Sequence, residues 1–153
     1  MKIVVSACLM GESCKYNGLD NYYRELVEAC ERTGTEVLLV CPEVFGGLPT
    51  PRKPSEIVNG EVRTCEGVSV DREFRQGAQR ALDMCEQAGG PSEIVACILQ
   101  DRSPSCGVGH IYDGSFSGTL TTGNGVFVDL LLRHGYRVIP ASEFDPSMLE
   151  HCP

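Results

Sequence analysis

Three short apolar runs in the sequence each lead to a cysteine within a few residues of the point where the run stops. The first run is followed by Cys8, the second by Cys41, and the third, after a serine-rich turn, by Cys106. Short, continuous and β-branched runs are typical of strands buried on both faces of a parallel sheet. Ligands bind beyond the carboxyl ends of such strands. The fold is therefore expected to bring the three cysteines to one edge of a sheet.

The apolar runs alternate with segments of helical periodicity. Strands are expected over residues 3–6, 36–40, 93–99 and 136–139. Helices are expected after Asp20 and Asp71, which suit the N-cap position, and over residues 124–134. This alternation indicates an α/β fold, a three-layer sandwich with a mostly parallel, Rossmann-like sheet. A length of 153 residues suits one domain spanning residues 1–153.

Two segments rich in Gly, Pro and Ser interrupt this pattern. Residues 42–54 and 101–118 are expected to form long irregular loops. Between them, Asn59 and Gly60 form a strong two-residue turn signal. This turn predicts a small hairpin insertion with strands over residues 56–58 and 61–63.

Charge and cysteine content restrict the partners and the compartment. A net charge of −8 argues against binding of polymeric nucleic acid, because that binding depends on clustered Lys and Arg, but a single base remains a possible ligand. Nine cysteines cannot all pair within one chain, which favours a reducing, cytoplasmic location. The apolar run before Cys8 is much shorter than the core of a secretory signal, so no membrane partner is expected.

Most of the other cysteines are expected to be structural. Cys30 and Cys85 lie on apolar helical stripes and Cys97 lies inside a strand, positions where a free cysteine packs as a small core residue. Cys14 is ambiguous, since it is near Cys8 in sequence but on a turn that leads away. Cys65 and Cys152 have no supported role.

The three strand-end cysteines have a stronger case for function. None belongs to a C-x2-C pair, so spacing alone leaves both a shared metal site and three core residues open. Ser103 and Ser105 could donate hydrogen bonds to a thiolate or to a bridging sulfide. His110, in the same segment, is expected to be a structural residue.

Several stretches together resemble one protein family. They are SACLMG, KYNG, CPEVFGGLPTPRKPSEI, DRSPSCG, YDGSF and GNGVFVDLLLRHGYRV. In order and spacing they are similar to the thiouracil desulfurase family, over essentially the whole chain. The resemblance implies a non-redox enzyme with a [4Fe-4S] cluster held by Cys8, Cys41 and Cys106. The iron left without a protein ligand would take the sulfur of a thiocarbonyl, so that 2- or 4-thiouracil gives uracil and sulfide.

Such chemistry needs a proton acceptor for the attacking water. Glu43, two residues after Cys41, is the first candidate, and a structural ion pair with Arg52 is its alternative role. Ser103 and Ser105 are expected to orient the substrate or relay a proton, and Ser6 is a weaker candidate of the same kind. The chain departs from the family pattern at Gln100-Asp101, where a lysine and a small residue are usual, and at KYNG in place of RYDG. These departures leave the substrate open.

Two other hypotheses remain. In one, the cysteines bind zinc or a redox-sensitive Fe-S cluster in a sensing module without turnover. In the other, Cys8 and Cys14 perform thiol redox chemistry, which their spacing does not favour. The expected partner is a small thiolated base, and the expected assembly is a monomer or small homo-oligomer.

Overall fold

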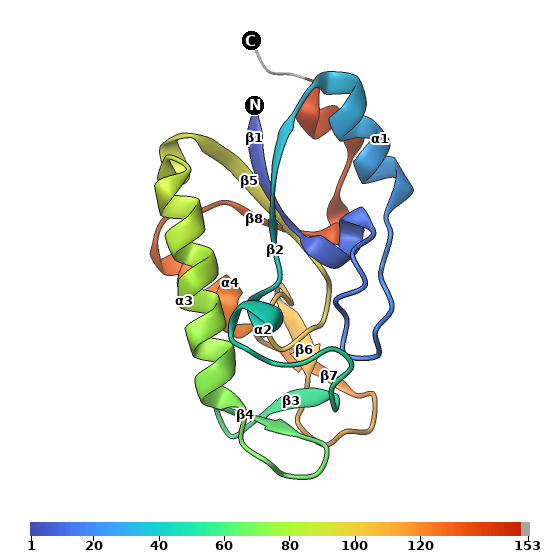
Figure 1. Ribbon diagram of the computed structural model, residues 1–153, viewed down its shortest axis with the longest axis vertical. Coiled ribbons are helices and arrows are strands. Elements are labelled where there is room, and N and C mark those ends of the chain that lie inside the picture. The colour runs from blue at the N-terminus through green and yellow to red at the C-terminus, as the bar shows by residue number, and fades with distance from the viewer. Residues whose placement is uncertain (151–153) are drawn as a thin grey trace.

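The computed structural model describes residues 1–150 and contains a central parallel sheet. Its strands are β1 (Lys2–Ser6), β2 (Glu36–Val40), β5 (Ile94–Leu99) and β8 (Val138–Pro140), in the order β2-β1-β5-β8. All three strand pairings are parallel. The predicted α/β fold with a parallel sheet is therefore confirmed (Figure 1).

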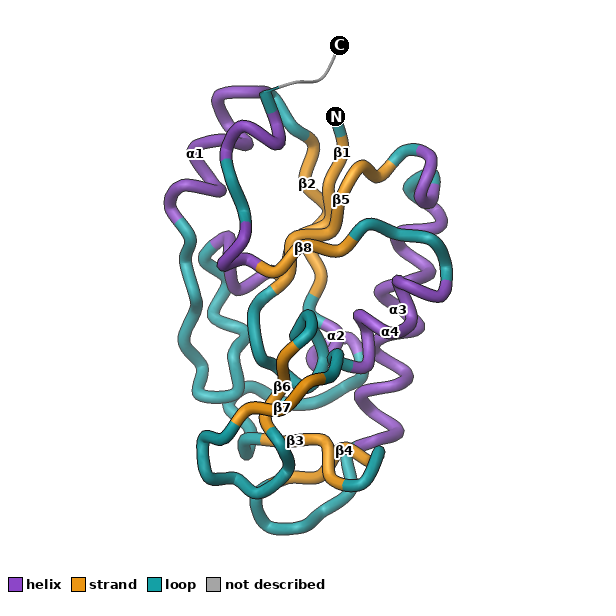
Figure 2. Tube along the Cα trace, turned by 180° about the vertical axis from the view of Figure 1, so that it is seen from behind, coloured by secondary structure: helices purple, strands orange, loops and turns teal. Residues whose placement is uncertain are grey.

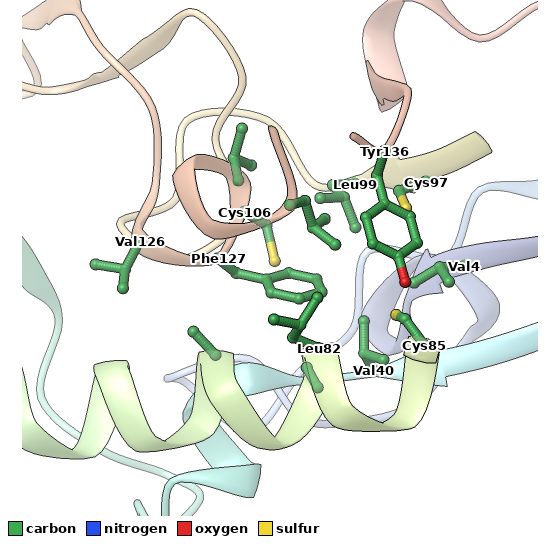
Figure 3. Packing of buried hydrophobic residues seen from close by; sticks show 14 of the residues in the cluster. Val4, Val40, Leu82, Cys85, Cys97, Leu99, Cys106, Val126, Phe127 and Tyr136 are labelled. Carbon is green, nitrogen blue, oxygen red and sulfur yellow. The ribbon is translucent and has the colours of Figure 1, made fainter. Parts of the chain in front are cut away.

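Helices cover both faces of this sheet. Helix α1 (Arg24–Thr33) lies on one face, and α3 (Asp71–Gln87) and α4 (Val126–Arg133) lie together on the other (Figure 2). Alternate residues of β1 enter the two layers, because successive strand side chains point to opposite faces. Ile3 and Val5 pack with α1, whereas Val4 packs with α3 and α4. Figure 3 shows Phe127 of α4 among the buried residues of the second layer.

One turn of helix, α2 (Pro42–Phe45), packs directly on the backbone of α3. Two glycines allow this close approach. A Cβ on Gly77 would lie 1.6 Å from the Pro42 carbonyl oxygen, and a Cβ on Gly46 would lie 1.9 Å from the Glu73 oxygen. Segment 42–54 was predicted to be irregular, and for residues 42–45 that prediction is wrong, because packing on α3 stabilises a helical turn that local sequence does not favour.

Two hairpins lie beyond the carboxyl ends of the sheet strands (Figure 1). The predicted hairpin is present as β3 (Ser55–Val58) and β4 (Glu61–Thr64). A second hairpin, β6 (His110–Tyr112) with β7 (Leu120–Thr122), lies in and after the segment expected to be irregular. The buried Glu56 joins the two, since its Oε1 accepts hydrogen bonds from the Gly114 and Phe116 amides at 3.0 and 3.2 Å.

Both predicted acidic N-caps are wrong. The first helix begins at Arg24 with Tyr23 as its N-cap, and Asp20 instead accepts a hydrogen bond from the Tyr22 amide at 2.9 Å in a local turn. Asp71 is the first residue of α3, and its carboxylate accepts from the Val62 amide of β4. A side chain that serves a neighbouring strand is not available to cap its own helix.

The remaining boundaries shift by one or two residues. The last helix occupies residues 126–133 of the predicted 124–134, and β8 begins at Val138 instead of residue 136. The described residues also contain four short 3-10 turns: η1 (Ala7–Met10), η2 (Gly90–Ser92), η3 (Ala141–Glu143) and η4 (Pro146–Leu149). Within residues 1–150, no helix is long and apolar enough to cross a membrane.

Candidate metal centre and active site

A cavity of about 560 Å³ opens at the carboxyl ends of β1, β2 and β5. All six predicted site residues line it, although they come from segments far apart in the chain. They are Cys8, Cys41, Glu43, Ser103, Ser105 and Cys106. The three strand-end cysteines therefore lie on one cavity at the edge of the sheet, as expected from the sequence.

Cys8 lies in the 3-10 turn that follows β1 and is buried. Its Sγ accepts a hydrogen bond from Nδ2 of Asn21 at 3.7 Å, and its carbonyl oxygen accepts from the Asn21 amide at 3.0 Å. Asn21 therefore holds both the backbone and the side chain of Cys8. Sequence reasoning overlooked Asn21, because a lone asparagine in a turn is common.

Cys41 is the N-cap residue of α2. Hydrogen bonding with the Cys14 thiol, followed by burial, raises the pKa of the Cys41 thiol, and the Val44 amide at the start of α2 opposes this shift. Because α2 rests on α3 through Gly77, the position of Cys41 is fixed by the packing of two helices.

Cys106 lies on the loop after β5, packed beside Phe127 of α4 (Figure 3). Burial raises the pKa of its thiol to about 12, and hydrogen bonds with the Ser6 and Ser105 side chains oppose that shift. Its amide donates to Ser103 Oγ at 2.7 Å. The loop touches the start of α4 so closely that a Cβ on Gly125 would lie 2.4 Å from the Ser105 carbonyl.

Glu43 is the centre of a polar network on the cavity wall. Its Oε1 accepts from Arg52 Nε at 3.1 Å, in an ion pair whose side chains are 7% and 15% exposed for Arg52 and Glu43. Its Oε2 accepts from Ser105 Oγ at 2.9 Å. The Ser103 and Ser105 hydroxyls are 3.2 Å apart. Since the Ser105 proton points to Glu43, Ser103 donates to Ser105, and a directed chain of hydroxyls ends at the carboxylate.

Cys14 is the residue whose place the sequence left undecided. The Glu12 amide donates to the Ala7 carbonyl at 3.3 Å and the Cys14 amide to the Glu12 carbonyl at 2.9 Å, so the backbone up to Cys14 stays close to the turn that carries Cys8. The Cys14 thiol hydrogen-bonds with those of Cys41 and Cys8. The Cys41 contact lowers the pKa of Cys14, but the Cys8 contact and burial outweigh it and raise that pKa to about 11.

The other cysteines behave largely as expected. Cys30, Cys85 and Cys97 are buried in the core, as predicted. Cys65 is exposed after β4 and also lines the cavity. Cys152 lies outside the described residues. His110 is the exposed first residue of β6 and is not among the residues that line the cavity. Ser6 is buried, and its hydroxyl accepts from the Gln100 amide at 2.9 Å.

The donor set suits an iron-sulfur cluster. Each of the three strand-end thiols has a hydrogen-bond partner that can stabilise a thiolate. The partners are Asn21 for Cys8, the Val44 amide for Cys41, and the Ser6 hydroxyl for Cys106. Among residues 1–150, no three His, Cys, Asp or Glu side chains converge tightly enough to hold a single metal ion. The ligands of a cubane bind separate irons around the cluster, so they do not need to converge on one point.

The fold and this cavity define an α/β protein with a thiol-lined pocket at the carboxyl edge of a parallel sheet. The sequence matches the 2-thiouracil desulfurase family model over residues 3–143. The chain belongs to this family, which confirms the family predicted from its motifs.

Two individual proteins are similar over almost the full length. The uncharacterized protein YbbK of Bacillus subtilis (strain 168) is 37% identical over 156 residues, covering 94% of this chain and 97% of that protein. A solved structure described as [4Fe-4S]-dependent thiouracil desulfidase TudS superposes with a TM-score of 0.85 at 41% identity. That alignment covers 94% of this chain and 92% of the solved one.

Proposed function

We propose that this protein is a [4Fe-4S]-dependent desulfurase that converts a thiolated nucleobase, such as 2- or 4-thiouracil, to uracil and sulfide without net redox change. The observation that carries the proposal is the convergence of three strand-end cysteines, a carboxylate and two serines on one cavity. Family membership and the 41% identity to a [4Fe-4S]-dependent thiouracil desulfidase support the same assignment.

Cys8, Cys41 and Cys106 are the proposed cluster ligands. Their thiols must lose protons on cluster binding, and the donors from Asn21, α2 and Ser6 stabilise the resulting thiolates. When bound, the cluster supplies a Lewis-acidic iron that has affinity for the thiocarbonyl sulfur of the substrate.

Glu43 is the proposed general base. The reaction adds one water to thiouracil and releases uracil and hydrogen sulfide, so both protons must leave the water oxygen and two protons must reach the departing sulfur. Glu43 accepts the first through Ser105, to which it is hydrogen-bonded at 2.9 Å, and returns it by the same route. Arg52 and the Ser103 hydroxyl hold this pair in one orientation. The ion pair with Arg52 is therefore compatible with the catalytic role.

The test is an anaerobic assay of sulfide and uracil released from 2- and 4-thiouracil. Glu43→Gln is expected to lower the rate by about 100-fold or more while iron content is retained, because a positioned base contributes about that much. Glu61→Gln is the matched control, because Glu61 also pairs with an arginine, Arg63, but lies on the hairpin. This variant should retain the parent rate. Loaded parent protein that releases no sulfide from either substrate would contradict the desulfurase assignment and leave a cluster-binding module without turnover.

A further inference from the structure

Glu56 is a buried carboxylate on the cavity wall that the proposed mechanism does not use. It lies on β3, is 8% exposed and lines the cavity. Its Oε1 accepts the hydrogen bonds from the Gly114 and Phe116 amides. Within residues 1–150, no group donates to its Oε2, and no cationic side chain pairs with it. A buried carboxylate normally has such partners, so this one has an unfilled place for a donor.

The free oxygen opens into the cavity. Protein atoms do not enclose Oε2, and Glu56 is one of the residues that form the cavity wall. The contact with the β6–β7 hairpin does not explain the negative charge, because a glutamine carbonyl would accept the same two amide hydrogen bonds. The charge and the second oxygen of Glu56 are therefore available to a ligand.

The surrounding backbone holds this carboxylate in one orientation. The tip of the β6–β7 hairpin packs on β3 so closely that a Cβ on Gly114 would lie 2.7 Å from the Ile57 carbonyl oxygen. Two amides of that tip bind Oε1, so Oε2 keeps a constant direction. An acceptor fixed in this way can select the orientation of a bound molecule.

Two aromatic residues line the same cavity. Tyr112 ends β6, and Phe116 lies in the hairpin tip whose amide binds Glu56. Phe116 has a φ of 56°, in the left-handed region that residues other than glycine adopt infrequently, and such backbone strain is common at ligand sites. Aromatic rings offer apolar faces to a planar heterocycle. The wall thus combines flat apolar surfaces with one charged acceptor.

Thiolated uracils carry a donor that matches this acceptor. In both 2- and 4-thiouracil, the ring nitrogen N3 bears a hydrogen and is bonded to the thiocarbonyl carbon. We propose that Glu56 Oε2 accepts a hydrogen bond from N3–H and thereby selects the base and orients its thiocarbonyl; this inference rests on the proposed function. The bond is charge-assisted, which makes it stronger than one between neutral groups. No covalent bond changes and no proton is transferred in this contact.

The contact predicts which bases the cavity accepts. A substituent at N3 would leave the buried carboxylate without its donor, and a site built around such a hydrogen bond rejects analogues that lack it. Substitution at N1 leaves this hydrogen bond in place. We therefore expect the protein to distinguish two isomers that differ only in the position of one methyl group.

The test compares kcat/KM of the anaerobically loaded protein for 2-thiouracil, 1-methyl-2-thiouracil and 3-methyl-2-thiouracil. For the parent, kcat/KM is expected to be roughly 10- to 100-fold lower for the 3-methyl than for the 1-methyl isomer, the effect of a lost hydrogen bond to a charged group. Glu56→Gln keeps an acceptor for both hairpin amides but places an NH2 group opposite N3–H. This variant should lose a similar factor with 2-thiouracil, and its two methyl isomers should react alike.

Glu66→Gln is the control, because Glu66 is an exposed carboxylate that pairs with Lys53 and does not line the cavity. It should keep the parent preference, and Glu56→Gln should keep the parent melting temperature and iron content. Equal kcat/KM for the two isomers in the parent would overturn the contact without any variant, and so would an unchanged preference in Glu56→Gln. Both results leave the proposed function intact, whereas a loaded parent inactive on all three bases would overturn both.

Discussion

The two walls of the cavity are built differently. The wall that carries Cys41 and Cys106 rests on helices α3 and α4, and glycines bring its backbone into direct contact with them. The wall that carries Cys8 and Cys14 is a connection between β1 and α1, and it exposes large apolar side chains to solvent: Tyr16, Leu19 and Tyr22. Packed helices fix one wall, while turns and a few hydrogen bonds hold the other.

This difference separates two tasks of the site. The proposed general base and two of the three proposed cluster ligands lie on the helix-backed wall, where close packing holds side chains in fixed positions. The third, Cys8, is buried where the opposite wall begins. Access of substrate needs a wall that can adjust, and loops with little buried apolar contact have the lowest local stability. The comparison predicts that small changes in the helix-backed wall are costly and that larger changes in the opposite wall are tolerated.

The largest effect is expected for Gly77→Ala. The added methyl would meet the Pro42 carbonyl, so α2 must move away from α3, at a cost of about 4 kcal/mol in unfolding free energy. Urea unfolding of the apoprotein measures this cost. Gln76→Ala, one residue earlier on the exposed face of α3, is the control and should change stability by less than about 0.5 kcal/mol. Equal unfolding free energies for the two variants would show that the helix-backed wall is not tightly packed.

Gly125→Ala is expected to cost about 3 kcal/mol. Its backbone angles suit any residue, so the effect comes from contact of the methyl with the Ser105 carbonyl. Because this contact displaces the Cys106 loop, bound iron should fall as well. Iron content and thermal unfolding of Gly125→Ala, compared with Leu132→Ala on the exposed side of α4, check this outcome. Full iron content in Gly125→Ala would show that the Cys106 loop can move without loss of bound iron.

Arg52→Gln is expected to destabilise the protein by about 2 kcal/mol, because it leaves the nearly buried Glu43 without its cation. The loss is smaller than for a fully buried pair, since the hydrogen bond from Ser105 remains. A double-mutant cycle with Glu43→Gln measures the coupling. Additive effects of the two substitutions would show that the ion pair contributes nothing.

The smallest effect is expected for Leu19→Ser on the opposite wall. Leu19 is 61% exposed, so its removal should change the unfolding free energy by less than about 0.5 kcal/mol. Chemical denaturation of the apoprotein provides the measurement. A loss as large as that of Gly125→Ala would show that this wall is also rigidly packed.

The strands and the positions of the three proposed ligands were predictable from the sequence, because both follow from local pattern. Buried parallel strands carry continuous apolar runs, and their carboxyl ends meet at one edge, which places Cys8, Cys41 and Cys106 on one cavity. The β3–β4 hairpin was predictable for a similar reason, since its Asn59-Gly60 turn is specified by two adjacent residues.

Other features depend on contacts between distant segments and leave little local signal. The strands β6 and β7 have three residues each, and β7 is exposed throughout, so they lack the apolar alternation that identifies a strand. Gly77 gives no sign in the sequence that it faces Pro42. Cys14 is held at the cavity by hydrogen bonds that include one between distant segments, from Arg52 to its carbonyl.

The central claim is that the strand-end cysteines hold a [4Fe-4S] cluster. Its most direct test is the iron and acid-labile sulfide content per chain after anaerobic reconstitution, measured for the parent, Cys106→Ser and the control Cys30→Ala, in a core thiol that does not line the cavity. We expect about four iron and four sulfide ions in the parent and the control, as in a cubane cluster, and a marked loss of both in Cys106→Ser. Little iron in the parent, or an undiminished content in Cys106→Ser, would contradict the claim.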